Sequence, residues 1–245
     1  HPCRNPADVD YVVAQAEVLK RMRSHFVARV RDVFRFKYQS FGPNGNIAND
    51  WHQVVVLTEW CQGGELVKYI ADRQREPSDN EVLQWMLQMA AGLRQMHEQD
   101  ALHRNLNPGN VYLDTQGTVR LASFQFAKVA RPVTKLLTHL RCAGGSPMTR
   151  APELERMDEP DDKADVWALG CVLYSLMTGT PPVNLAGRPI EDIVGSMSLR
   201  FSSCTRQVLR MCLQPDRELR ASAKQVFCYL KSGIKVSQPV RVAQQ

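Results

Sequence analysis

Apolar residues in the first part of the chain recur at steps of three and four positions. Between residues 7 and 23 the repeating positions are Val9, Val12, Val13, Ala16, Leu19 and Met22. A period of about 3.6 residues predicts a helix with one apolar face. Residues 26–38 and 53–60 are rich in Val and Phe or in β-branched residues, which predicts two strands. The Gly- and Asn-containing residues 41–50 are predicted to form the loop between these strands.

The next part of the chain carries the helical pattern. The pair Gly63-Gly64 ends the second strand, and a helix is predicted from there to about residue 72. Residues 79–98 form the longest predicted helix, capped by Ser78 or Asp79. Its apolar face consists of Val82, Trp85, Met86, Met89, Leu93 and Met96. A stripe of this kind is typical of core packing, so we interpret it as core and not as a cofactor site.

Shorter elements follow, and the chain then returns to helices. Short β-branched or apolar runs beside a Gly-containing turn predict two paired strands, and a long apolar run predicts a buried helix. The predicted elements are strands at residues 111–113 and 119–122 around a turn at 114–117, irregular structure at 123–151, a helix at 164–177, further helices to about 230, and a tail at 238–245.

The composition is that of an ordinary soluble domain, with 44% apolar and 23% charged residues. The longest apolar run, residues 166–177, is too short to span a membrane, and the start of the chain carries no signal-peptide pattern. We therefore expect no membrane partner. Because the chain begins at His1 and not at a methionine, we expect it to be part of a longer protein.

Seven cysteines are scattered, are odd in number and lack C-x-x-C spacing, which predicts free thiols in a reducing, cytoplasmic compartment. His139 and Cys142 lack further ligands nearby, so no metal site is predicted. The net charge of +6 is modest, and no nucleic-acid partner is expected. Basic residues gather early in the chain and are interpreted as a solvated face, with an acidic partner as the alternative. They are Arg21, Arg23, Arg29, Arg31, Arg35 and Lys37.

Residues 102–114 carry a pattern with a known chemistry. His103, Arg104 and Asn110 stand at the spacing of H-R-D-x-x-x-x-N, the catalytic loop of protein kinases. Asn105 occupies the position of the catalytic aspartate in that pattern. The question therefore becomes whether the chain phosphorylates anything at all.

Other motifs follow in the order of the kinase family. Residues 56–61 resemble the strand and hinge that contact adenine, with Thr58 as gatekeeper, and Glu65 stands where kinases often bind ribose. Residues 151–153 resemble the A-P-E motif, and residues 165–170 resemble D-x-W-x-x-G. Arg220 stands where kinases place the partner of the A-P-E glutamate.

Residues 10–230 thus resemble a eukaryotic protein kinase. The sequences of their motifs resemble those of the NIMA-related kinases most, for example at 110–113 and 168–174. The resemblance implies an α+β, bilobal kinase-like fold with a truncated or incomplete β-rich N-lobe and a mainly helical C-lobe. The implied parts are a partial N-lobe at residues 1–60, a C-lobe at 61–232 and a tail at 233–245.

The resemblance also implies that several catalytic groups are replaced. An amide such as that of Asn105 has no basic lone pair to accept a hydroxyl proton, a role worth roughly 10²- to 10⁴-fold. Asn107 replaces the lysine that steadies the transferred phosphate. Ser123, followed by Phe124 and Gln125, stands where D-F-G provides the magnesium carboxylate. Asn110 alone is a poor anchor for magnesium, and its alternative role is to bond the loop backbone.

Parts of the kinase nucleotide site are also missing from the N-terminal region. No G-x-G-x-x-G loop or V-A-I-K lysine precedes the first helix. The family's layout puts both before residue 1, so either they are lost or they lie upstream of His1. Gln15 falls at the position of the helix glutamate that pairs with this lysine, with Glu17 as the alternative. These losses argue against phosphotransfer, because each group serves a separate electrostatic task.

The retained residues are those with structural roles in kinases. The resemblance implies that His103, Phe124, Leu19 and Val30 stack as a spine between the lobes. It also implies that Asp165 accepts hydrogen bonds from the catalytic-loop backbone, and that Glu153 and Arg220 form a buried ion pair. Ser146 is expected to make a structural contact rather than serve as a phosphorylation site.

The sequence supports several functional hypotheses. The first is a catalytically inactive kinase domain, a pseudokinase, that acts as a protein-interaction scaffold or allosteric regulator. No cofactor is then expected. The second is a nucleotide-binding switch that holds ATP weakly and without magnesium, through Thr58, Glu59, Cys61, Glu65, Tyr112 and Asn110.

The third hypothesis rests on the NIMA-related resemblance alone, which implies a structural part in a microtubule or ciliary assembly. In that case the partner is a large cytoskeletal assembly and the location is the cytoskeleton or the cilium. An active serine/threonine kinase is the least favoured hypothesis, because the base and the metal carboxylate are both absent at Asn105 and Ser123.

Overall fold

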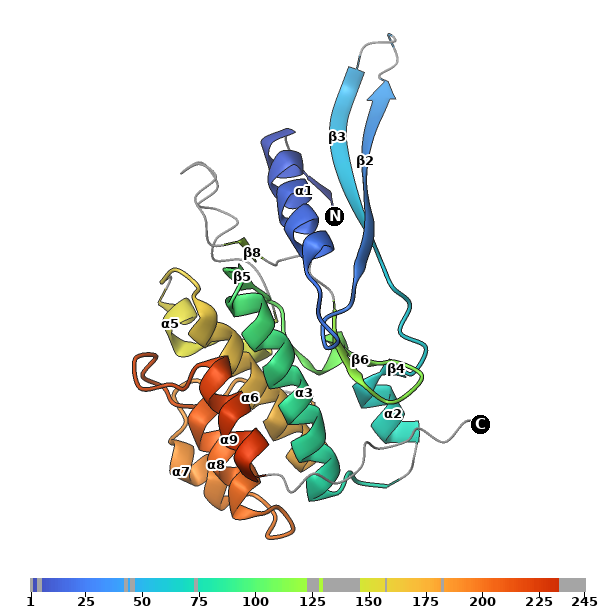
Figure 1. The fold of residues 1–245 in the computed structure, drawn as a ribbon. Helices are drawn as coiled ribbons and strands as arrows, with labels where there is room; N and C mark the ends of the chain where they lie inside the picture. Colours follow the sequence, from blue (N-terminus) through green and yellow to red (C-terminus); the bar gives the residue numbers. More distant parts are fainter. Residues whose placement is uncertain are drawn as a thin grey trace.

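A small antiparallel sheet and one helix form the N-terminal part of the molecule, and helices dominate the rest (Figure 1). The computed structural model describes residues 2–3, 6–41, 44, 47–72, 75–122, 128–129, 146–156, 158–181 and 183–233. This division into a sheet-containing part and a helical part agrees with the predicted α+β class. The predicted boundaries of the two lobes and the tail remain predictions.

Helix α1 (Pro6–Arg21) lies against the sheet formed by β1 (Pro2–Cys3), β3 (Ile47–Thr58) and β2 (Val30–Phe41), in that order. All pairs are antiparallel. Apolar residues of α1 pack against one face of the sheet because the helical and strand periods place them on facing sides. The packed residues are Val9, Val12 and Val13 from the helix and Val33, Val54 and Val56 from the strands.

The β2–β3 hairpin is longer than predicted. The loop predicted at residues 41–50 is too long, because β2 continues to Phe41 and β3 begins at Ile47. Pairing continues to the end of the hairpin, with Ser40 opposite Asn49 and Phe41 opposite Ile47. Ladder hydrogen bonds between the strands prevail there over a local composition that favours a turn. Figure 1 shows the hairpin projecting beyond the end of α1.

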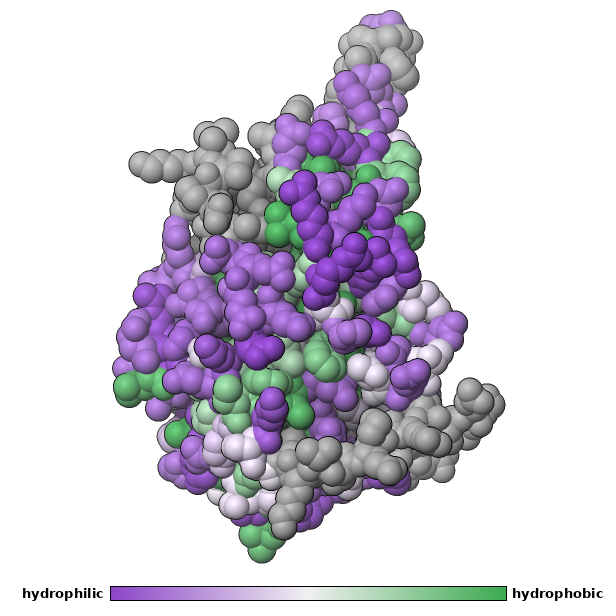
Figure 2. Space-filling model, viewed as in Figure 1, coloured by the Kyte–Doolittle hydropathy of each residue, from purple (hydrophilic) through white to green (hydrophobic). Residues whose placement is uncertain are grey.

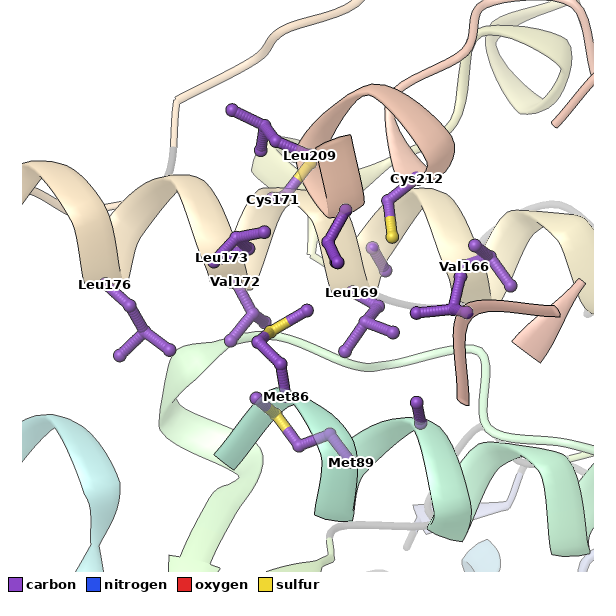
Figure 3. Close-up of a cluster of buried hydrophobic side chains, with 14 of the residues drawn as sticks. Met86, Met89, Val166, Leu169, Cys171, Val172, Leu173, Leu176, Leu209 and Cys212 are labelled. Atoms are coloured by element: carbon purple, nitrogen blue, oxygen red, sulfur yellow. The ribbon is translucent and has the colours of Figure 1, made fainter. Parts of the chain in front are cut away.

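The helical part is built around α6 (Asp162–Thr178), which has neighbours on two sides. Figure 3 shows Met86 and Met89 of α3 (Asp79–His97) pointing at Leu169 and Val172 of α6. On the other side of α6, Leu209 and Cys212 of α8 (Ser203–Cys212) close the cluster. The remaining helices are α2 (Leu66–Asp72), α5 (Pro152–Glu155), α7 (Ile190–Gly195) and α9 (Ala223–Gly233). The methionine stripe is therefore core, as predicted.

The start of α3 is fixed by a capping box. The Ser78 hydroxyl accepts the backbone N–H of Glu81 at 3.3 Å, and the Glu81 carboxylate accepts the backbone N–H of Ser78 at 2.9 Å. Ser78 is therefore the cap, and Asp79 is the first residue of the helix. Such caps contribute about 1 kcal/mol, and this one holds in place the helix whose other end leads into the catalytic-loop motif.

Two smaller sheets connect the parts. The strands β4 (Gly64–Glu65), β6 (Val111–Leu113) and β7 (Val119–Leu121) form one, and β5 (Ala101–Leu102) pairs with β8 (Lys128–Val129) in the other. The β6–β7 hairpin confirms the two strands predicted around residues 114–117. The short strands β4, β5 and β8 were not predicted, because two-residue strands leave no pattern to detect.

None of the helices that the structure describes is long and apolar enough to cross a membrane. Among the cysteines whose side chains the structure describes, Cys61, Cys171, Cys204, Cys212 and Cys228 are free thiols, as the sequence predicted.

Candidate functional site

The catalytic-loop motif lies between β5 and β6. After Leu102 the chain leaves the sheet, passes through His103 and Asn105, and forms the short helix η1 (Pro108–Asn110) before β6. Pro108 suits the first position of η1, where its missing N–H costs nothing. Arg104 has a positive φ of 60°, which turns the chain sharply at the motif.

Asp165, on α6, holds this turn in place. Its two carboxylate oxygens accept the backbone N–H groups of His103 and Arg104, each at 2.8 Å, and His97 Nε2 lies 2.9 Å from Oδ2. The predicted contact between Asp165 and the catalytic-loop backbone is therefore present. Burial of the carboxyl is the largest influence and raises its pKa. The hydrogen bond from His97, together with the neighbouring imidazoles and the His103 backbone N–H, outweighs burial and leaves the pKa of Asp165 below its ordinary value.

His103, whose backbone N–H binds Asp165, is fully buried. Its Nδ1 accepts the backbone N–H of Asn105 at 3.3 Å. Burial lowers the pKa of the ring, so it is neutral at physiological pH. Leu19 and Val30 share one buried cluster, in keeping with the expected spine. Phe124 lies outside the described residues, so the complete stack remains a prediction.

Three amide side chains lie at the centre of the loop, and two of them, those of Asn105 and Asn107, stand at positions where kinases carry charge. Asn105 is only 7% exposed. Its backbone carbonyl accepts hydrogen bonds from Asn110 Nδ2 at 2.7 Å and from Asn107 Nδ2 at 3.0 Å. The Asn107 side-chain oxygen accepts the N–H of Gly109 at 3.0 Å. Asn110 thus bonds the loop backbone, which is the alternative role considered for it, and the amides hold the loop closed.

This set of donors does not fit magnesium. A site for this hard cation usually includes one or two carboxylates, whereas Asn105, Asn107 and Asn110 carry amides that are engaged with the loop. Within the part of the chain that the structure describes, no three His, Cys, Asp or Glu side chains gather closely enough to hold a metal ion. Ser123, at the predicted metal position, lies outside the described residues.

The predicted hinge follows the end of β3. Thr58 is half-buried at the last residue of that strand, and Cys61 is 8% exposed. Cys61 forms a buried cluster with Ala28 and Ala122, and Tyr112 of β6 packs against it. Burial raises the pKa of the Cys61 thiol to about 11, so it is not a thiolate. Tyr112, predicted beneath the adenine ring, therefore lies against the hinge residue itself.

The two acidic residues of this region are engaged with basic neighbours. Glu59 accepts the backbone N–H of Arg29 at 3.1 Å and lies 3.8 Å from the Arg120 side chain. Glu65, the predicted ribose residue, forms an ion pair with Lys68 at 2.9 Å. Because Glu65 pairs with Tyr112 across β4 and β6, the residues predicted to contact ribose and adenine lie side by side.

The A-P-E segment is tied to the helical core. Glu153 on α5 and Arg220, between α8 and α9, are almost completely buried and form the expected ion pair at 2.7 Å. Thr149 donates its hydroxyl hydrogen to the carbonyl of Leu106 at 2.9 Å, which joins this segment to the catalytic loop. Ser146 accepts the N–H of Met148 and caps η3 (Pro147–Thr149), so it makes a structural contact, as expected.

Sequence reasoning missed several of these contacts. His97 and Thr149 support the catalytic loop from segments distant in sequence, and Ala28 and Ala122 line the hinge. Small or ordinary residues of this kind give no motif. Gln15 and Glu17, the two candidates for the position of the helix glutamate, lie on α1. The Gln15 side chain lies outside the described residues.

Comparison with known proteins matches the chain to one family. Residues 4–229 match the model of the protein kinase domain. The chain is 33% identical to mouse serine/threonine-protein kinase Nek1 over 77% of its length and 34% identical to human serine/threonine-protein kinase Nek5 over 78%. It is also 32% identical to serine/threonine-protein kinase ATG1b of Arabidopsis thaliana over 65%.

The chain spans 16% of the length of Nek1, 25% of Nek5 and 22% of ATG1b, so the likeness concerns their kinase domain. Two of these relatives are NIMA-related kinases, the family that the motif sequences resemble most. The α+β fold with its helical C-lobe also agrees with the family match. The chain belongs to the protein kinase family, with the NIMA-related kinases among its relatives.

Proposed function

We propose that this kinase domain is a pseudokinase: it transfers no phosphate and serves as a protein-interaction scaffold or allosteric regulator. The observation that carries the proposal is the buried amide of Asn105 at the position of the catalytic base. A general base must accept the proton of the substrate hydroxyl, and an amide has no basic lone pair with which to do so. The neighbouring amides of Asn107 and Asn110 bond the loop instead of a phosphate or a metal.

The contacts that have structural roles in the family are retained although the catalytic base is not. Asp165 still holds the catalytic-loop turn, and the Glu153–Arg220 pair still anchors the A-P-E segment. A fold that keeps its internal supports while its reaction centre is neutral is suited to presenting surfaces. We further propose that the partner is a protein and that no cofactor is resident.

The test is a phosphotransfer assay with γ-labelled ATP and magnesium, in which the protein itself and casein are the acceptors. A serine/threonine kinase assayed in parallel is the positive control. We expect no more label from the natural protein than from its Asn105→Ala variant, which keeps the backbone contacts of the loop. Transfer that Asn105→Ala abolishes would overturn the proposal.

Two further parts of the proposal concern the protein's location in the cell and its binding of ATP. A microtubule or ciliary assembly in the cytoplasm is the partner that the NIMA-related likeness favours, and this rests on family analogy. Weak binding of ATP without magnesium is the alternative to a purely structural role. The retained hinge at Thr58, Glu59 and Cys61 favours this alternative, whereas the packing of Tyr112 opposes it.

A further inference from the structure

The strand β2 presents a row of exposed aromatic side chains. Phe34, Phe36 and Tyr38 are each 43–44% exposed, and the rings of Phe36 and Tyr38 stack with centroids 6.4 Å apart. On the neighbouring strand, Val55 is 38% and Leu57 is 50% exposed. Figure 2 shows apolar surface at the border of this sheet. Exposed apolar patches of this kind often mark interaction sites.

These residues lie on the face of the sheet that α1 does not cover. Successive side chains of a strand alternate between faces. Val33 of β2 packs against α1, so Phe34, Phe36 and Tyr38 point to the opposite face. Val55 is the cross-strand partner of Phe34 and shares that face.

The same strand forms the edge of its sheet. Among the described residues β2 pairs with β3 alone. The N–H of Val33 donates to the Asp32 side chain at 2.9 Å, so it points away from the β3 ladder. In an antiparallel pair this direction alternates, so Arg35 also turns its N–H and C=O to the free edge. Such an edge is a template for another strand.

The charges of β2 disfavour a second copy of the chain, paired about the middle of the strand, as the added strand. Arg35 and Lys37 stand on the face opposite to the aromatic row. A two-fold antiparallel pairing centred on residue 35, 36 or 37 would place Arg35 opposite itself, Arg35 opposite Lys37, or Lys37 opposite itself. Like charges directly opposite each other are destabilising.

We propose that the free edge of β2 binds an extended segment of a protein partner in which acidic residues alternate with apolar residues. The acidic side chains would lie opposite Arg35 and Lys37, and the apolar ones would cover Phe34, Phe36 and Tyr38. Within the described part of the chain, Asp10 contacts Arg35 through Nη1 at 2.9 Å, and a guanidinium has further N–H donors that can bind a second carboxylate. Strand addition of this kind joins main-chain hydrogen bonds to side-chain selectivity. The inference names the chemistry of the partner in the interaction role proposed above and rests on that role.

The test uses fluorescence anisotropy with a labelled peptide of about ten residues in which Glu alternates with Val and Phe. We expect saturable binding that the double variant Arg35→Glu/Lys37→Glu weakens by roughly tenfold or more. A peptide with Lys in place of Glu should bind the double variant more tightly than it binds the natural protein. This swap alters the peptide alone, so the result for the natural protein does not depend on the folding of a variant.

Two matched variants separate strand addition from general charge attraction. Arg35→Pro removes an N–H on the free edge and should abolish binding, whereas Arg210→Glu, on the exposed face of α8, should leave it unchanged. Absence of binding at millimolar peptide, or binding that is indifferent to the charge swap, would overturn the inference. So would a dimer in sedimentation that Arg35→Pro dissociates. The phosphotransfer assay decides the pseudokinase proposal separately, whatever the peptide does.

Discussion

Arg220 binds Glu153 through two parallel hydrogen bonds, 2.7 Å from Nη1 to Oε1 and 3.0 Å from Nη2 to Oε2. The guanidinium also donates to the carbonyls of Gln214 at 2.8 Å and Lys163 at 3.0 Å, and it lies 5.0 Å from the centre of the Trp167 ring. All the polar atoms of the pair are therefore satisfied inside the protein. The contact joins α5, α6 and the segment after α8 at one buried point.

Breaking this pair should be costly, because the remaining charge would stay buried without a partner. We expect Arg220→Met or Glu153→Gln to lower the free energy of unfolding by about 3–5 kcal/mol. Urea denaturation followed by circular dichroism measures this change. The exposed pair of Arg210 and Glu191, at 2.8 Å, is the matched control, and Glu191→Gln should cost less than about 1 kcal/mol. Equal losses at the two pairs would contradict this reasoning.

Gly170 lies where α6 closely approaches the end of α8. A Cβ atom at this position would lie 2.7 Å from Leu213 Cδ2 and 2.8 Å from Cys212 Cβ. We expect Gly170→Ala to destabilise the protein by about 1–3 kcal/mol through overpacking. Gly195, at the end of α7, has no atom within 4 Å of such a Cβ. Gly195→Ala should therefore change the midpoint of thermal unfolding little, and a loss as large as that of Gly170→Ala would show that overpacking is not the cause.

The helical core and the supports of the catalytic loop could be predicted from the sequence. The Ser78–Glu81 capping box and the stripe through Met86 and Met89 are local patterns, and they specify α3 almost to the residue. The roles of Asp165 and of the Glu153–Arg220 pair follow from motif spacing, because the family fold brings those positions together. The structure contains both contacts.

Other features depend on contacts that no local pattern encodes. The length of the β2–β3 hairpin is set by pairing between Ser40 and Asn49, whose neighbourhood favours a turn. In β2, apolar residues occupy both faces, so alternation alone does not reveal that Val33 is covered and Phe34 exposed. The cluster around Tyr112 draws on three distant segments and therefore leaves no trace in any one of them.

His103 should make stability depend on pH. Burial lowers the pKa of its ring in the folded protein, so the unfolded chain takes up this proton at higher pH than the folded one. Stability is therefore complete above the ordinary histidine pKa of about 6.5 and falls as the pH drops below it. The lowered pKa of Asp165 acts only below the ordinary aspartate value of about 3.9, outside this window.

We expect the free energy of unfolding to decline between about pH 7 and pH 5, and His103→Tyr to flatten this decline. The measured quantity is the slope with pH, because the variant also loses the contact with the Asn105 N–H and is weaker at every pH. The exposed His25 is the control, and His25→Gln should keep the natural slope. An unchanged slope in His103→Tyr would exclude His103 as the titrating group.

Tyr112 decides whether the hinge is free to bind a nucleotide. It packs against the cluster of Ala28, Cys61 and Ala122, and we propose that it takes the space that an adenine ring would need. We expect no thermal shift of the natural protein with millimolar ATP. Tyr112→Leu removes part of the ring and should yield a shift that grows with adenosine or ATP concentration, as ligand linkage requires. Tyr112→Phe keeps the ring and should behave like the natural protein.

The magnesium dependence of that shift separates the two nucleotide hypotheses. A nucleotide held by apolar contact and the hinge needs no metal, and the amides of Asn105, Asn107 and Asn110 offer magnesium little. The shift in Tyr112→Leu should therefore be the same with magnesium and with EDTA. A shift of equal size in the natural protein would show that Tyr112 does not occlude the hinge, and a shift that requires magnesium would show that a metal site has survived.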